Sequence, residues 1–106
     1  NDYQILRLTQ DQTGDRTLFI SGATGVSFDS SISTGEVRTI AIAWKNGSTP
    51  YYINTVQIDG NNQTVKYEGG TAPSAGNANS IDWYTFSIIK TGTAQFEVYG
   101  TFAKFA

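Results

Sequence analysis

The sequence predicts an all-β domain, an antiparallel β-sandwich of jelly-roll type with about seven to nine strands. Tyr84, Phe86 and Ile88 alternate with Thr85 and Ser87, which is the two-residue period of a strand with one buried face. No window of useful length shows the periodicity of a helix. Short apolar runs are separated by clusters of Gly, Asn, Asp and Ser, as expected for strands joined by tight turns.

The expected strands follow one another between these clusters. They lie at Asn1–Thr9, Thr17–Ser21, Glu36–Lys45, Tyr51–Ile58, Thr64–Glu68, Asp82–Lys90 and Ala94–Phe105, with Val26–Phe28 as a candidate for a further short strand. Asp29–Gly35 and Gly69–Ser80 are expected to be loops because they are rich in small and polar residues.

Two turns are predicted from their residue types. Asn46-Gly47 is the strongest hairpin signal in the chain, because both residues tolerate a positive φ. Asp59-Gly60-Asn61-Asn62 predicts a second hairpin. The same segment places oxygen ligands at alternate positions, as the start of a calcium loop does, but it lacks the following Gly and the distal acid. The turn is therefore the favoured interpretation, and no metal site is expected.

Length and composition limit the possible functions. The 106 residues predict one domain over 1–106, which buries roughly 65% of the surface of the unfolded chain. The net charge of −2 and the lack of a basic run argue against a nucleic-acid partner. No apolar run approaches the roughly 20 residues that a membrane span requires. Because the chain starts at Asn1 and contains no Met, we expect a processed product or a piece of a longer polypeptide.

Catalysis is not expected from this set of side chains. His and Cys are both missing from the sequence, which excludes Ser-His-Asp and Cys-His nucleophilic sites and typical zinc ligation. A carboxylate pair of the glycosidase kind remains as an alternative, but no spacing brings two carboxylates together. The available acids are Asp59, Glu68, Asp82 and Glu97. We predict a non-enzymatic protein without a cofactor.

Aromatic and small residues provide the candidate contact surfaces. In Glu36–Lys45, the bulky Ile40, Ile42 and Trp44 share one side, while small apolar residues occupy the other, which predicts cover on both sides. Trp83 lies on the side opposite Tyr84, so one of the two must point away from the core, toward a ligand or another subunit. The candidate interface or ligand-contact residues are Ala41, Ala43, Trp83, Thr85, Tyr51, Tyr52 and Tyr67. We favour a second subunit over a stacked sugar, because the small residues permit close approach.

The C-terminal part of the chain resembles virion proteins of tailed phages, especially cyanobacterial and marine phages. The resemblance rests on the loop Tyr67-Glu68-Gly69-Gly70-Thr71-Ala72-Pro73 that runs on to Asp82, the strand Tyr84-Thr85-Phe86-Ser87-Ile88-Ile89-Lys90-Thr91-Gly92 and the ending Lys104-Phe105-Ala106. It covers Thr39 to Ala106, and the first 38 residues carry no recognised motif. The group usually has Trp where this chain has Tyr67.

The resemblance implies a non-enzymatic structural domain of a tail fibre or appendage, commonly a homotrimer. It transfers no catalytic residue. The expected location is the virion, on a tail fibre, an appendage or the capsid surface, with other phage virion proteins as partners and host cell-surface glycan as a further contact. A capsid decoration or cement protein and a carbohydrate-binding adhesion module remain as alternatives.

Overall fold

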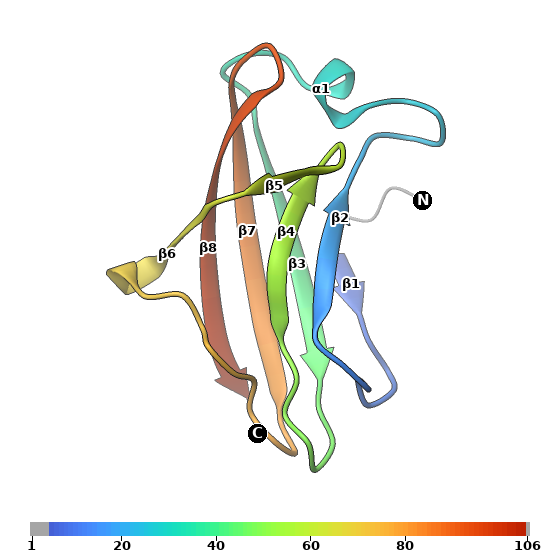
Figure 1. Ribbon diagram of the computed structural model, residues 1–106, viewed down its shortest axis with the longest axis vertical. Coiled ribbons are helices and arrows are strands. Elements are labelled where there is room, and N and C mark those ends of the chain that lie inside the picture. Colours follow the sequence, from blue (N-terminus) through green and yellow to red (C-terminus); the bar gives the residue numbers. More distant parts are fainter. Residues whose placement is uncertain (1–4, 106) are drawn as a thin grey trace.

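The computed structural model describes residues 5–105 as two β-sheets packed face to face (Figure 1). The five-stranded sheet has the order β1-β3-β7-β8-β6, and the three-stranded sheet has the order β2-β4-β5. The strands are β1 (Ile5–Arg7), β2 (Arg16–Ile20), β3 (Val37–Lys45), β4 (Ile53–Ile58), β5 (Asn61–Gln63), β6 (Val65–Tyr67), β7 (Ile81–Gly92) and β8 (Gln95–Phe105). The prediction of an all-β sandwich is confirmed. The Asn1–Gln4 part of the first expected strand lies outside the described residues.

The sheets are mixed, which differs from the purely antiparallel arrangement that we expected. The pairs β3–β7, β7–β8 and β4–β5 are antiparallel, whereas β1–β3, β2–β4 and β6–β8 are parallel. Each parallel pair joins two strands that are not consecutive in the chain, and one strand of each pair is short. A parallel pair needs a crossover connection. Between β1 and β3, and between β2 and β4, the chain passes through the other sheet, whereas between β6 and β8 it passes through β7 of the same sheet.

The core lies between the sheets and is built from the predicted buried faces. Tyr84, Phe86 and Ile88 are completely buried, and Trp44 and Ile42 of β3 are each 2% exposed. The backbone N–H of Ile53 donates a 3.1 Å hydrogen bond to the hydroxyl of Tyr84, which connects the two sheets inside the core. Burial raises the pKa of this hydroxyl, so Tyr84 stays neutral.

β8 needs a glycine where it pairs with the edge strand β6. Gly100 pairs with Phe86 of β7 and with Tyr67 of β6. A Cβ at this position would lie 2.9 Å from the Tyr67 ring and 2.9 Å from a Val65 methyl group. The lack of a side chain at Gly100 therefore allows Tyr67 to cover the core.

The expected hairpin at Asn46-Gly47 is wrong. The strands on either side, β3 and β4, belong to different sheets, and neither residue adopts a positive φ. The buried Asn46 side chain instead accepts hydrogen bonds from the Trp44 indole N–H and the Tyr51 backbone N–H, both at 3.1 Å. These bonds direct the chain across the sandwich. They override the local turn preference of the dipeptide.

The second predicted turn is confirmed at Asp59-Gly60, but the returning strand is β5, which starts at Asn61 inside the expected turn. The expected returning strand Thr64–Glu68 instead contains β6, which belongs to the five-stranded sheet. β4 and β5 pair antiparallel around Asp59-Gly60, whose φ values are 50° and 83°. Such a two-residue turn requires positive φ at both positions, which explains the glycine.

The candidate strand at Val26–Phe28 is wrong, because Phe28 begins the short helix α1 (Phe28–Ser31). The Ser27 hydroxyl caps this helix by accepting a 3.1 Å bond from the Ser30 N–H. The Asp59 carboxylate accepts further bonds from the Phe28 and Asp29 N–H groups, at 2.7 and 3.0 Å. Three of the free N–H groups of the helix start are thus satisfied, which stabilises helix over strand.

The expected loop Gly69–Ser80 begins in a single 3-10 turn, η1 (Glu68–Gly70), and has no further helix or strand before β7. In the part of the chain that the structure describes, no helix has the length and apolar character to cross a membrane.

Candidate functional site: the outer face of the five-stranded sheet

The side of the five-stranded sheet that faces away from the core is the candidate site, and we call it the outer face. Strand geometry sends alternate side chains to opposite sides, so the odd-numbered residues of β3, β7 and β8 point outward here. Strand register places them in rows. The rows are Lys45–Ile81–Phe105, then Ala43–Trp83–Ala103, then Ala41–Thr85–Thr101.

One end of the outer face is strongly apolar. Ile81 and Trp83 are each 38% exposed, and Phe105 is 56% exposed, whereas the neighbouring core residue Tyr84 is fully buried. Single exposed apolar residues are ordinary on protein surfaces, but a contiguous group marks a contact site. The exposures of Trp83 and Tyr84 show that Trp83 is the aromatic residue of β7 that faces outward.

These residues line a groove of about 680 Å³, which we call the outer groove. Its walls are formed by Arg7, Leu8, Thr9, Ala43, Lys45, Ile81, Trp83 and Phe105. Lys45 already forms a 2.8 Å ion pair with Asp11, whereas Arg7 forms no ion pair with any residue in the range 5–105. The groove thus combines an apolar floor with the guanidinium of Arg7, which is not ion-paired within residues 5–105.

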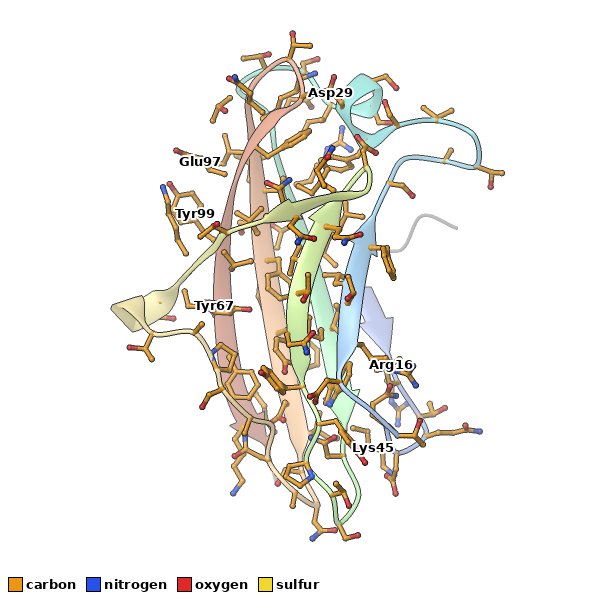
Figure 2. The ribbon with its side chains drawn as sticks, in the orientation of Figure 1. Arg16, Asp29, Lys45, Tyr67, Glu97 and Tyr99 are labelled. Carbon is orange, nitrogen blue, oxygen red and sulfur yellow. The ribbon has the colours of Figure 1, made fainter. Side chains whose placement is uncertain are left out.

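The other end of the outer face carries both apolar and polar side chains, because its row is Val37–Ile89–Glu97 and Val37 is 53% exposed. The Tyr99 hydroxyl donates a 3.0 Å bond to Glu97, and the Lys66 ammonium lies 3.6 Å from Glu97 and 5.5 Å from the Tyr99 ring centre. Figure 2 shows Glu97 and Tyr99 toward the opposite end of the molecule from Lys45. The middle of the face carries only small side chains, so another surface could approach it closely.

The structure divides the seven candidate contact residues into two groups. Four of them lie together on the outer face: Ala41, Ala43, Trp83 and Thr85. The other three, Tyr51, Tyr52 and Tyr67, are partly buried and pack against the core from the opposite side of the sheet. Figure 2 shows the Tyr67 side chain directed inward, and burial raises the pKa of its hydroxyl. Trp83 is therefore separated from the three tyrosines, so these four aromatic residues do not form one sugar-stacking platform.

Only Ala43 and Trp83 of the groove residues were among the predicted contacts, and sequence reasoning missed the other six, which are Arg7, Leu8, Thr9, Lys45, Ile81 and Phe105. Ile81 lies two residues before Trp83 in the same strand, so the alternation of side chains predicts that both point to the same side. Arg7 belongs to β1 and Phe105 to β8, which lie at opposite ends of the described sequence. Only the register of β1 and β8 with the strands between them brings these side chains to the groove.

The four carboxylates available for a catalytic pair lie in separate places. Asp82 is completely buried and accepts bonds from Asn77, at 3.0 Å from the backbone N–H and 2.7 Å from the side chain. Asp59 is engaged at the start of α1, at the opposite end of the sandwich. Glu97 lies on the outer face, and Glu68 is exposed in η1. Among residues 5–105, no group of three or more His, Cys, Asp or Glu side chains converges as a metal site would require.

No family model, no curated protein and no solved structure matches this chain.

Proposed function

We propose that this chain is a non-enzymatic structural domain of a phage virion, part of a tail fibre or appendage, and that it assembles as a homotrimer. The exposed apolar end of the outer face carries the proposal, because such a surface is stable in water when a second protein covers it. The resemblance of residues 39–106 to tailed-phage virion proteins supplies the virion context. Other virion proteins and a host surface glycan are the proposed partners.

Trp83 offers the direct test of assembly. We expect the unmodified chain to show three times its monomer mass by size-exclusion chromatography with light scattering, and Trp83→Ala to shift the population toward monomer. Truncating an aromatic residue at the centre of an interface costs about 2–4 kcal/mol, which weakens assembly by at least roughly 30-fold. Phe19→Ala is the matched control, since Phe19 is 73% exposed on the other sheet. A monomeric unmodified chain at high concentration would contradict the proposal.

The virion location is tested on particles. Mass spectrometry of purified phage particles should detect the chain, and antibody labelling followed by electron microscopy should place it on the tail or on the capsid surface. Labelling of the capsid alone would favour the decoration-protein alternative.

Carbohydrate binding is the second candidate, because an exposed indole in a groove beside a cation suits a sugar ring. Adsorption to host cells discriminates the two functions of Trp83. Loss of adsorption with an intact oligomer in Trp83→Ala would assign the groove to a glycan. Loss of the oligomer would assign it to assembly.

A further inference from the structure

The segment 68–72 forms an exposed corner of the five-stranded sheet, which we call the corner segment. It follows β6 at the edge of the sheet and projects sideways beyond β8 (Figure 1). All of its residues are exposed. Gly69 and Gly70 both have positive φ, at 81° and 82°, and a Cβ on either would meet no atom within 4 Å. The corner segment is therefore a narrow projection that contacts little of its own chain.

The corner segment and the outer groove are complementary in charge and shape. Glu68 carries a negative charge that forms no ion pair within residues 5–105, and the same holds for the positive charge of Arg7 in the groove. The small side chains of Gly69, Gly70 and Ala72 suit a groove of about 680 Å³ whose floor is apolar. One surface is a projection and the other is a recess.

The two surfaces cannot meet within one chain. β1 and β6 are the opposite edges of the five-stranded sheet, so Arg7 and Glu68 are separated by four strand spacings, roughly 19 Å. A contact between them must join two copies. It is a heterologous contact, and such contacts form a closed ring when the rotation between successive copies closes, and an open filament otherwise. Here the corner segment projects from an edge of the sheet and the groove opens on its face.

We propose that the corner segment of one copy docks in the outer groove of the next, with Glu68 paired to Arg7, and that three such contacts close the homotrimer. This inference rests on the proposed function, because it names the two surfaces that the proposed assembly would use. It also accounts for both features of the groove. The apolar floor receives the small residues of the corner segment, and Arg7 receives the carboxylate.

A charge exchange tests the pairing. Glu68→Arg and Arg7→Glu should each raise the dissociation constant of the trimer by roughly tenfold or more, because each places like charges together. The double variant should recover most of the loss, since the pair is restored with its charges exchanged. Arg16→Glu is the matched control, because Arg16 is an exposed arginine of the other sheet and should leave assembly unchanged.

Disulfide trapping provides a second test that does not depend on an energy. The chain has no Cys, so a variant with both Arg7→Cys and Glu68→Cys can form only engineered disulfides. A disulfide needs Cα atoms about 4–7 Å apart, which excludes a bond within one copy. Oxidation should produce covalent trimer on a non-reducing gel. The matched pair Arg16→Cys and Glu68→Cys should produce no more covalent trimer than random collision does.

The outcomes separate this inference from the proposed function. In the first case the unmodified chain is a trimer, but the single charge variants assemble normally. In the second case it is a trimer, but the double variant does not recover assembly and the cysteine variant forms no covalent trimer. Either result shows that the docking contact is wrong while the proposed assembly stands. If the unmodified chain is a monomer, both are wrong.

Discussion

At the scale of single residues, a buried polar group decides the path of the chain. Asn46 is 3% exposed, and its amide donates bonds to the backbone carbonyls of Tyr51 and Asn77, at 2.9 and 3.2 Å. The same amide nitrogen lies 3.4 Å from the carboxylate of the fully buried Asp82. The Asn46 amide finds carbonyl acceptors, and Asp82 accepts bonds from Asn77, which is why two polar side chains are tolerated inside this end of the sandwich.

Asn46→Asp should destabilise the protein by about 2–4 kcal/mol. The change removes two hydrogen-bond donors and places a second carboxylate beside Asp82. Urea denaturation measures the loss, and Asn61→Asp, at an exposed position, should change the free energy of unfolding by less than about 0.5 kcal/mol. Equal effects of both substitutions would contradict the role assigned to Asn46.

At the scale of elements, the stability of helix α1 comes from hydrogen bonds to two carboxylates, because the helix is too short to be stable alone. Asp59 reaches it from the β4–β5 turn, while Asp29, inside the helix, connects to the β7–β8 hairpin. The Asp29 carboxylate lies 3.0 Å from the Lys90 ammonium and accepts a 2.7 Å bond from the Ala94 N–H. Four residues would not form a stable helix in isolation, so these contacts hold α1 against both sheets.

The Asp29 contacts should make this end of the molecule sensitive to acid. The hydrogen bond with Lys90, followed by that from Ala94, lowers the pKa of Asp29 below its ordinary value of 3.8. A lowered pKa in the folded state contributes stability above the unfolded value, and this contribution is lost as the pH falls through the folded value. The melting temperature of Asp29→Asn should therefore lie below that of the unmodified chain near neutral pH, and the gap should close in acid below pH 3.8. Thermal scans across this range check it, and a gap independent of pH would count against the ion pair.

At the scale of the whole molecule, two sheets form a thin sandwich whose edges are closed by crossing segments. The Cα atoms of the described residues extend over 41 × 31 × 19 Å, the thickness of two layers. β5 and β6 are separated by the single residue Thr64, so one extended segment leaves the small sheet and joins the large one. β1 and β2 occupy the opposite edges in the same way (Figure 1). The core between the sheets carries the stability, and the outer face remains available for contact.

Truncation of a core phenylalanine and of a surface phenylalanine should change the free energy of unfolding by very different amounts. Phe86→Ala removes a ring that is 0% exposed and should lower the free energy of unfolding by about 3–5 kcal/mol. Phe19→Ala removes a ring that is 73% exposed and should change it by no more than about 0.5 kcal/mol. Urea denaturation of both variants below the concentration for assembly gives the comparison. A large decrease in the free energy of unfolding for Phe19→Ala would contradict the exposed position of that ring.

The sequence by itself determined the faces of the strands, because burial with a two-residue period is a local property. The alternation in 82–90 placed Tyr84 and Trp83 on opposite sides of the strand, and Asp59-Gly60 identified its turn through the positive φ that the turn requires. Tertiary structure decided which strands pair and in which direction, since pairing depends on residues far apart in the chain. The hydrogen bonds of Asn46 sent β4 to the other sheet, and the Asp59 carboxylate stabilised a helix where a strand was expected. The outer groove exists for the same reason: Arg7, Trp83 and Phe105 meet only through the register of β1, β3, β7 and β8.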